Sequence, residues 1–450
     1  MKTTRREFLE RGVQGTIGTT LAVSGLASRV KAAAPTDRVV LGIIGTGGRG
    51  CAAGPWFAER SDVEVAYVCD AHPGRLANGV HAIEKVTGKK PKAVIDFRKV
   101  LDDKQVDAVY APLPHQWHAL VTVLACQAGK DIYVEHPGGH TIWEGQKMIE
   151  AARKYNRVVQ VGTQMRSSSY AKSAREIIRS GKLGDIHLVR IFNMFCRDRF
   201  NRLPDSLTPK GMNWDLWLGP APMRPYSDTW FLDWLNFWDF SGGIIDDDAD
   251  HQVDLFRMVT GMGYPKSVYH AGGNLAFHDY VQVPDTSIVT YEYDEMKVIL
   301  EEIWWAPYMK KTPESIRESR TQYAHFFPFN GERIEIYGNN AMMVLGRHGG
   351  GWWLFDVHGQ KIAEQKQPHI EIQKAHIANF IECTRTRQRP NADIAVNVPS
   401  TRMCEMANVS YRVGNRKLEF DPNTGTFNDE EADRYLKPSY RTPWVVPEKV

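Results

Sequence analysis

Between residues 38 and 162, short apolar runs alternate with amphipathic stretches. Runs rich in β-branched residues are typical of strands buried on both faces, as in parallel sheets. The stretches over 118–128 and 142–155 predict helices between such strands. This alternation predicts a doubly wound parallel sheet, which binds ligands at the carboxyl ends of its strands. The predicted strands cover 38–44, 63–69, 106–111, 131–135 and 157–162.

The pattern changes after about residue 165. A helical stretch over 170–182 is followed by a long alternating run over 186–193. Further strand-like segments then follow one another without intervening helices, which indicates an antiparallel sheet. We therefore predict an α/β Rossmann domain followed by an α+β domain with a large, mostly antiparallel open sheet. The later predicted strands cover 267–273, 286–293, 296–305, 332–338 and 341–346.

A glycine-rich loop follows the first predicted strand directly and has the pattern G-x-G-x-x-G. The first glycine permits a tight turn, the second lets backbone approach a pyrophosphate, and the third lets the helix pack close to the strand. The helix N-terminus then faces the phosphate charge. The loop is predicted to bind a dinucleotide through Gly45, Gly47, Gly48, Arg49 and Gly50.

An acidic residue at the end of the second predicted strand supports this interpretation. Asp70 lies 20 residues beyond Gly50, where a carboxylate is expected to meet the adenosine ribose hydroxyls. A carboxylate there would repel a 2′-phosphate, so it favours NAD over NADP. Arg75 lies close enough to weaken that repulsion, and we assign it to the same end of the cofactor site.

The ends of the later strands carry polar side chains that we expect to lie together. Parallel strands present their carboxyl ends at one edge of the sheet, which is where the cofactor and substrate should meet. We assign cofactor contacts there to Pro112, His115, His118, Glu135 and Gln164, and we expect His136 and Arg166 close by.

Composition narrows the class of protein. The chain has 450 residues, enough for two domains, and its formal net charge of +3 comes without a long basic block. That balance predicts no binding to nucleic acid. Beyond the N-terminal segment, no apolar run is long enough for a membrane span. None of the six cysteines forms a CxxC pair, so we expect free thiols.

The N-terminus has the order of features found in an export signal. Thr4-Arg5-Arg6-Glu7-Phe8-Leu9 resembles a twin-arginine motif, a weakly apolar stretch follows, and small residues come at 32–34. We predict that residues 1–34 are a targeting peptide and that the protein is periplasmic. The twin-arginine route exports folded proteins, so a tightly held cofactor could be loaded before export.

Residues 38–445 resemble the Gfo/Idh/MocA oxidoreductase family over nearly their whole length. The resemblance includes the glycine loop with Asp70 and a Pro-His-Gln-Trp-His loop at 114–118 that approaches the nicotinamide in the family. The stretch 242–254 resembles the family's Gly-Gly…Asp…His-x-x-Asp helix start. His376–Phe380 with Arg389–Asp393 resembles its C-terminal return to the first domain, and Asn213–Pro220 is similar to exported members.

The resemblance implies a catalytic group around His251. It makes His251 the base for a substrate hydroxyl, with Asp247 placed to orient the ring if the helix already includes that residue. One departure stands out, because the family usually reads Glu-Lys-Pro where this chain has Glu135-His136-Pro137. His136 therefore takes the place of a lysine that assists proton transfer, and an imidazole can also act as acid or base.

Substrate contacts are expected from Arg166, Asp254 and Trp238. The acidic run Asp246–Asp250 with His251 contains groups that can bind a divalent metal. Its spacing matches no calcium loop and offers no second histidine nearby, so we predict no metal. The run also suits a helix N-terminus, where acidic residues are stabilised.

Three functions fit these observations. The first is NAD-dependent oxidation or reduction of a secondary hydroxyl on a sugar or glycoside. The second is redox-neutral glycoside hydrolysis, in which bound NAD oxidises a ring hydroxyl, the aglycone is eliminated, water adds and the hydride returns; some relatives of the family act in this way. The third is a non-catalytic sugar-binding protein on the same scaffold.

The expected domain organisation follows the same pattern. After the targeting peptide we place an NAD-binding domain over 35–165, a substrate and oligomerisation domain over 166–395, and a C-terminal helix and tail over 396–450 that pack back on the first domain. Open antiparallel sheets often pair, so a homo-oligomer is expected. The expected small-molecule partner is a carbohydrate.

Overall fold

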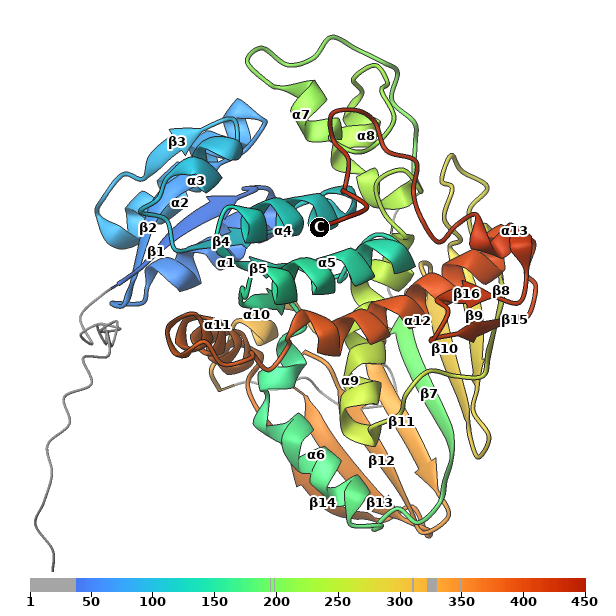
Figure 1. Ribbon diagram of the computed structural model, residues 1–450. Helices are drawn as coiled ribbons and strands as arrows, with labels where there is room; N and C mark the ends of the chain where they lie inside the picture. Colours follow the sequence, from blue (N-terminus) through green and yellow to red (C-terminus); the bar gives the residue numbers. More distant parts are fainter. Residues whose placement is uncertain (1–37, 195, 198, 310, 322–329, 349) are drawn as a thin grey trace, which may run out of the picture. The chain divides into compact units, whose positions relative to one another are not determined.

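The computed structural model describes residues 38–450 apart from 195, 198, 310, 322–329 and 349 (Figure 1). The predicted targeting peptide, residues 1–34, lies outside the described residues. No helix in the described part of the chain is both long enough and apolar enough to cross a membrane.

The first sheet has six strands in the order β3-β2-β1-β4-β5-β6, and every neighbouring pair is parallel. This arrangement confirms the predicted Rossmann domain. Its strands are β1 (Val39–Ile44), β2 (Val63–Cys69), β3 (Lys92–Val94), β4 (Ala108–Ala111), β5 (Asp131–Val134) and β6 (Val159–Val161). Its helices are α1 (Gly48–Ala58), α2 (Pro73–Thr87), α3 (Arg98–Asp102), α4 (His118–Gln127) and α5 (Ile142–Lys154).

Burial explains why the central strands read as continuous apolar runs. All residues of β4, β5 and β6 are buried, because helices cover both faces of the sheet. Helix α2 begins at His72, whose ring accepts hydrogen bonds from the backbone of Gly74 and Arg75, and it ends at the left-handed Gly88. Helix α5 begins in the same way, with Thr141 capping Glu144.

The second sheet has ten strands, and only the β7–β10 pair among its described ladders is parallel. This confirms the large, mostly antiparallel sheet. Its order is β14-β13-β12-β11-β7-β10-β9-β8-β15-β16. The bounds are β7 (Ile186–Met194), β8 (Ser267–Gly273), β9 (Thr286–Glu292), β10 (Lys297–Ile303), β11 (Arg333–Gly338), β12 (Ala341–Gly346), β13 (Gly351–Asp356), β14 (Lys361–Gln365), β15 (Leu418–Asp421) and β16 (Thr426–Phe427).

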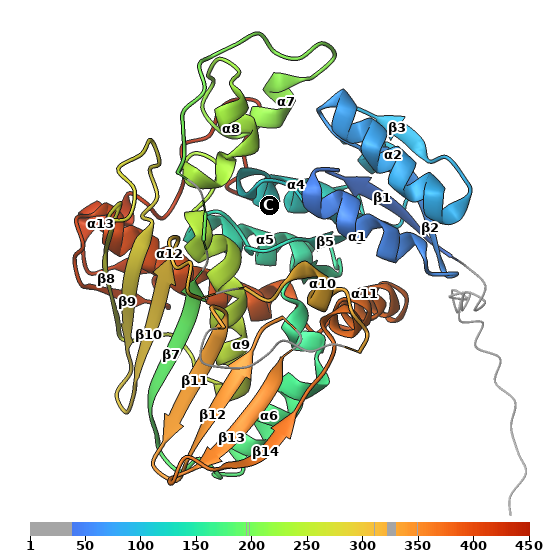
Figure 2. The same ribbon diagram turned by 180° about the vertical axis from the view of Figure 1, so that it is seen from behind.

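Helices pack on one face of this sheet, and Figure 2 looks onto the other face. They are α6 (Ser169–Arg179), α9 (Asp250–Thr260) and α12 (Ile394–Arg412), and their apolar residues share one core with the sheet. Helix α12 also packs against α5 of the Rossmann domain, while α11 (His369–Thr386) adds Ile377 and Phe380 to that domain's core. The remaining short helices are α10 (Glu314–Arg317) and α13 (Glu430–Asp433).

A long excursion between β7 and α9 forms an aromatic cap (residues 200–240). It contains α7 (Trp214–Leu218), α8 (Asp228–Leu232) and the short turn η3 (Trp234–Asn236), which lie above α4 in Figure 1. Its own small core consists largely of aromatic rings, with Trp214 and Trp217 stacked 4.7 Å apart. A compact core of this kind lets the cap hold its shape although it has little regular structure.

The C-terminal tail fastens the aromatic cap to the Rossmann domain. Arg441 pairs with Asp215 of α7 and donates to the carbonyl oxygen of Ala221. Trp444 then packs edge-on against Trp117 and at a tilt against Phe97, and Val446 and Val450 join the same core. The tail therefore contacts both the cap and the first domain.

Candidate functional site

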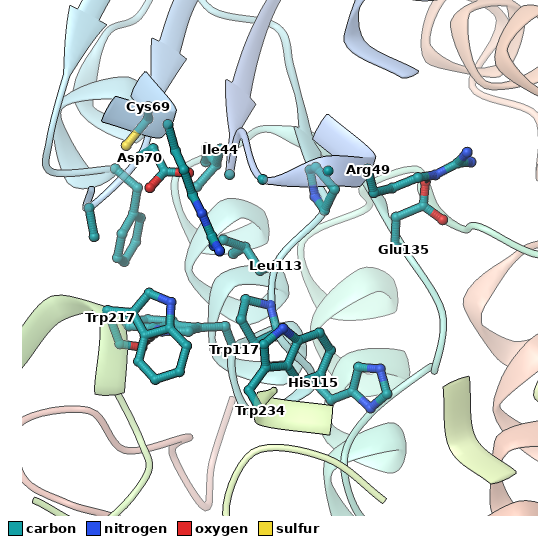
Figure 3. A pocket seen from close by; sticks show the side chains of 18 of the residues that line it. Ile44, Arg49, Cys69, Asp70, Leu113, His115, Trp117, Glu135, Trp217 and Trp234 are labelled. Carbon is teal, nitrogen blue, oxygen red and sulfur yellow. Dashed lines mark hydrogen bonds and ion pairs between the residues drawn. The ribbon is translucent and has the colours of Figure 1, made fainter. Parts of the chain in front are cut away.

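A cavity of about 470 Å³ opens at the carboxyl ends of the parallel strands. This is the expected position for a ligand in such a sheet, and the volume is in the usual range for small-molecule sites. Figure 3 shows residues of its wall, with Asp70 on one side, Arg49 and Glu135 on another, and tryptophans opposite. The lining includes Ile44, Gly45, Gly47, Gly48, Arg49, Cys69, Asp70, Arg75, Pro112, Leu113, His115, Trp117, Glu135, His136, Trp217, Leu232, Trp234 and Asp247.

The glycine loop leaves its backbone bare toward this cavity. Gly45 has φ +102°, and a Cβ there would lie 2.7 Å from the carbonyl oxygen of Pro112. A Cβ on Gly50 would lie 2.1 Å from the carbonyl oxygen of Gly45, so both positions require glycine. Gly48 has open space where a Cβ would stand, and no side chain caps the start of α1. A helix N-terminus with an open glycine surface fits a pyrophosphate.

Asp70 holds the loop and lines the cavity at the same time. Its carboxylate accepts hydrogen bonds of 2.8 Å from the backbone N–H of Thr46 and of His72. A carboxylate has lone pairs left after two such bonds, so it can also accept from ribose hydroxyls. Arg75 lies beside it, with its guanidinium 3.8 Å from the ring centre of Phe231 in the aromatic cap. These residues fit the adenosine end of NAD.

A second charged pair lies across the loop. Arg49 donates to Glu135 at 2.7 Å, and the same carboxylate oxygen accepts from the Tyr110 hydroxyl at 2.8 Å. Burial alone would raise the pKa of Glu135, but Arg49 holds it below its ordinary value. Glu135 is therefore a paired carboxylate that anchors the loop after β5 next to the glycine loop. The predicted Gln164 lies behind this pair, bonded to the Tyr133 hydroxyl rather than on the cavity wall.

The other end of the cavity gathers three imidazoles and a carboxylate. His115 Nε2 lies 3.5 Å from Asp247, and the rings of His136 and His251 lie 3.9 Å apart between centres. His136 and Asp247 line the cavity, whereas His251 lies directly behind His136 and is 5% exposed. The Nδ1 atoms of all three histidines are buried without a hydrogen-bond partner. No other group of the protein therefore occupies these three nitrogens.

Burial and nearby charges set the protonation of this group. Burial lowers the pKa of His136 to about 4. Burial also lowers the pKa of His251 far below its ordinary value, and the guanidinium of Arg347 adds to the effect. For Asp247, burial acts in the opposite direction, but the hydrogen bond with His115 and the His136 ring bring the pKa below its usual range. At neutral pH the site therefore combines the neutral imidazoles of His136 and His251 with the ionised carboxylate of Asp247.

The local helix geometry explains why the side chains of Asp246 and Asp247, which are neighbours in the chain, point in different directions. Residues Ile245–Ala249 form a π-helical turn (η4) that leads into α9. Asp247 points to the cavity with its side chain 34% exposed, whereas Asp246 is fully buried and accepts from Asn408. Asp247 is bonded to His115 instead of His251, so it does not orient His251 as expected from a regular helix. A π-helical turn is wider than a regular α-helical turn, so the side chain of Asp247 does not lie on the same face as His251, with which it was predicted to pair.

Several other residues that were predicted to contact cofactor or substrate do not line the cavity. Arg166 and Asp254 form a buried ion pair at 2.7 Å, and Asp254 also accepts from Ser400. They join η2 (Gln164–Ser167), α9 and α12, and we assign them no substrate contact. His118 is completely buried, with Nε2 2.8 Å from the carbonyl oxygen of Leu113 and Nδ1 2.9 Å from that of Pro137, and its neutral ring can donate to one of them. Trp238 lines a different cavity.

Three other residues of the cavity wall were not predicted from the sequence. Trp117, Trp217 and Trp234 line the cavity, the last two from the aromatic cap. Trp117 belongs to the Pro-His-Gln-Trp-His loop that the sequence analysis identified. No local sequence pattern indicated that residues 217 and 234 would lie on the same cavity wall as that loop. Behind His251, Asp248 and Glu332 form ion pairs with Arg347, and Lys311 pairs with the same two acids.

Among the described residues, no group of three or more histidine, cysteine or acidic side chains is arranged to hold a metal ion. The three imidazoles near Asp247 therefore do not form a coordination shell in this geometry.

Family models match three stretches of the chain between residues 39 and 446. Residues 39–163 match the oxidoreductase family model for an NAD-binding Rossmann fold. Residues 171–344 match a GFO/IDH/MocA C-terminal domain, and residues 336–446 match an oxidoreductase-family C-terminal alpha/beta domain.

Two curated relatives are similar over part of their length. The uncharacterized oxidoreductase YrbE of Bacillus subtilis is 25% identical over 58% of this chain and 65% of its own. A glycosyl hydrolase family 109 protein of Shewanella baltica is 24% identical over 40% of this chain and 44% of its own. The chain thus spans less than two thirds of either relative.

Solved structures share the fold at low identity. The WlbA dehydrogenase from Bordetella pertussis, in complex with NADH and UDP-GlcNAcA, is 18% identical, with a TM-score of 0.61 over 85% of this chain and 99% of that one. The aldose-aldose oxidoreductase from Caulobacter crescentus, complexed with glycerol, is also 18% identical, with a TM-score of 0.61 over 85% and 100%. The matching family models, the two sheets and the glycine loop agree, and the chain belongs to the Gfo/Idh/MocA family of NAD-binding oxidoreductases.

Proposed function

We propose that this protein uses NAD to oxidise or reduce a secondary hydroxyl of a sugar or glycoside. The observation that carries the proposal is the position of His136 and Asp247 on the same cavity as the glycine loop. NAD, when bound, supplies the hydride acceptor or donor. Gly45–Gly50, Asp70 and Arg75 would hold it, and the chain's own residues must then manage the hydroxyl proton.

The imidazole pair is the proposed base. A hydroxyl proton must be taken by a group within hydrogen-bond reach, and a neutral imidazole can accept it. His136 lines the cavity, and His251 lies against it with a free Nδ1. We assign the direct contact with the hydroxyl to His136, which lines the cavity, and place His251 behind it as the partner of the His136 ring. Asp247, held by His115, would stabilise the imidazolium that forms.

The carbohydrate assignment rests on the cavity wall opposite the glycine loop. Trp234 lines it with its ring centre 5.0 Å from that of His115, and Trp117 and Trp217 lie farther along the same wall (Figure 3). Aromatic faces pack well against the C–H faces of sugar rings, while polar groups take the hydroxyls. The names of the solved relatives, a dehydrogenase with a bound nucleotide sugar and an aldose-aldose oxidoreductase, point to the same class of substrate.

The test is turnover by the full protein with a panel of sugars and glycosides. Reduced nicotinamide is followed at its absorbance band while NAD is supplied. At least one sugar should be oxidised, and His251→Asn should abolish turnover while NAD binding persists. If no sugar in either direction changed the nicotinamide, the proposal would fail.

A second candidate is the redox-neutral glycosidase. It is favoured by one specific observation, His136 at the position of the family's lysine, and by similarity to glycosyl hydrolase family 109 proteins. The distinguishing test is incubation with aryl glycosides without added NAD. Catalytic aglycone release with no net change in the cofactor would favour this candidate over a simple dehydrogenase.

We also propose export through the twin-arginine motif and self-association through the large sheet. Replacing Arg5 and Arg6 by lysine should retain the protein in the cytoplasm of a host with that pathway. Light scattering on the mature protein tests its association state. A cytoplasmic wild-type protein, or a strict monomer, would contradict the respective proposal.

A further inference from the structure

A cleft of about 340 Å³ lies where η2, α6, the end of α9 and the loop before α12 meet. Figure 1 shows α6 beside α9, and the two helices pack against each other. The residues that line this cleft do not line the cofactor cavity. Its wall has four cations, Arg166, Lys172, Arg175 and Arg179, and one acid, Glu176. We call it the basic cleft.

Three of the four cations come from one side of α6. Lys172, Arg175 and Arg179 are spaced three and four residues apart, so they follow one another along the helix surface. All three are exposed, and none of them forms an ion pair within the described part of the chain. Glu176 lies on the same helix and can offset only one of their charges. Like charges at this spacing repel each other, so an anion between them would be stabilised.

The fourth cation, Arg166, is buried and does not use all of its hydrogen-bond donors. It is 9% exposed, and its Nη2 donates to Asp254 at 2.7 Å and lies 3.5 Å from the carbonyl oxygen of Val396. Its Nε is buried without a partner. Its Nη1 makes no hydrogen bond within the described residues and is not fully buried, so it opens onto the cleft. An unpaired donor in such a place favours a ligand that accepts hydrogen bonds.

The acids of α9 behind the cleft do not cancel its charge. Asp254 offsets Arg166, but the guanidinium of Arg257 lies close enough to interact with both of them. The other acid of α9 is Asp250, and burial raises its pKa well above its ordinary value, so it carries no charge at neutral pH. The three cations of α6 and Arg257 therefore leave positive charge around the cleft.

We propose that the basic cleft binds the phosphate group of a small phosphorylated compound. The phosphate oxygens would accept from Nη1 of Arg166, and the cations of α6 would surround them, since guanidinium and ammonium groups are the usual partners of phosphate. The rest of the ligand would lie against Met258 and Asn391, which complete the lining. The volume is at the lower end of the range for small-molecule sites, which fits a compact ligand.

The test uses the full protein saturated with NAD, so that the glycine loop is already occupied. Calorimetry in a Tris-chloride buffer compares ethyl phosphate, inorganic phosphate and ethanol. Ethyl phosphate has no secondary hydroxyl, so it is not a substrate for the proposed oxidation. One ethyl phosphate should bind per chain, at least as tightly as inorganic phosphate, and ethanol should not bind. No binding of ethyl phosphate, or tighter binding of inorganic phosphate, would overturn the proposal.

Two variants locate the site. Lys172→Gln combined with Arg175→Gln removes two exposed charges from the cleft and should weaken ethyl phosphate binding by about tenfold or more. Arg166→Lys keeps a positive charge opposite Asp254 but removes the Nη1 donor, and it should weaken binding by about tenfold as well.

A matched control removes the same charge elsewhere. Lys85→Gln combined with Lys90→Gln changes two exposed lysines at the end of α2 and just after it, and this variant should bind ethyl phosphate as the wild type does. Melting curves confirm folding, and the exposed double variant in α6 decides the outcome if Arg166→Lys does not fold. Wild-type binding by that folded double variant, or an equal loss in the control, would show that the assignment is wrong.

Discussion

The two ends of the cofactor cavity are built in different ways. At the nucleotide end, backbone from one loop forms the surface, and Asp70 fixes that loop by accepting a hydrogen bond from the backbone N–H of Thr46. At the reaction end, side chains come from separate segments after β4, after β5 and from η4, with Trp234 from the aromatic cap. The first end depends on glycine at particular positions, whereas the second depends on the packing of distant elements.

This difference predicts that the two ends can be damaged separately. Changes in the glycine loop should remove NAD binding, because steric room for the cofactor disappears. Changes among His115, His136, His251 and Asp247 should remove turnover and leave NAD bound.

The largest effect is expected at the imidazole pair. His136→Ala and His251→Ala should each lower turnover by about 10²–10⁴-fold, the usual contribution of a positioned base. NAD affinity, measured by calorimetry, should stay within a few-fold of the wild type. Unchanged turnover in both variants would instead favour a non-catalytic sugar-binding protein.

Gly50→Ala should weaken NAD binding by about 100-fold or more, because its Cβ would lie 2.1 Å from the carbonyl oxygen of Gly45. The loop must shift to relieve this contact, so the melting temperature should fall as well. Gly48→Ala is the control for stability, since its Cβ meets no atom within 4 Å. Tight NAD binding by Gly50→Ala would show that the cofactor lies elsewhere.

Asp70→Asn should have a smaller effect at the same end. The neutral amide is a weaker acceptor for ribose hydroxyls and for the Thr46 and His72 backbone, so NAD affinity should fall by about tenfold. Removing the charge should also narrow the preference for NAD over NADP, because Arg75 remains nearby. Affinities for both cofactors test this, and a preference that did not change would argue against the assigned role.

The pH dependence of turnover sharpens the assignment at the reaction end. Burial lowers the pKa of His136 to about 4, so its ring stays neutral down to that pH. A base must be unprotonated, and kcat/KM should therefore fall only as the pH decreases through about 4, not near 6.5. His136→Lys, which restores the family's residue, should move this acid limb. An unchanged limb in that variant would remove His136 from the proton path.

The smallest effect is expected from the tail that fastens the aromatic cap. Arg441→Ala removes the ion pair with Asp215 and the hydrogen bond to Ala221, at a cost of about 1 kcal/mol or less. KM for the sugar should rise a few-fold because Trp234 is held less firmly beside His115, and any loss of NAD affinity should be smaller. An equal loss of NAD affinity would mean that the tail supports both ends alike.

The contrast between the two ends also explains what could be predicted from the sequence. The first strand, the glycine loop, the first helix and Asp70 lie close together in the chain, so their pattern could be recognised from the sequence. The strands and the helix are confirmed by the fold. Most strands of both sheets followed from their apolar runs. Strands β3, β13, β14, β15 and β16 were not predicted. The polar β14 lies at the sheet edge and shows no buried alternation, and β3, β15 and β16 have only two to four residues each.

Contacts between segments that are distant in the chain could not be predicted from local sequence patterns. Arg166 and Asp254 are polar residues near predicted strand and helix ends, but they neutralise each other in the interior. Trp217 reaches the cavity only because the aromatic cap folds over α4. Trp117 lies 100 residues earlier in the chain, and its indole N–H donates to the carbonyl oxygen of Trp217. The π-helical turn redirected Asp247 from His251 to His115, which a regular helix would not do.

The most direct measurement follows hydrogen from a sugar carbon to the cofactor. The full protein is incubated with NAD and substrates deuterated at each ring carbon in turn, and the nicotinamide is recovered for mass spectrometry. The account predicts that one labelled position transfers a single deuterium, and that His251→Ala abolishes the transfer although NAD remains bound. Sugar binding with no deuterium on the nicotinamide, whichever carbon is labelled, would contradict it.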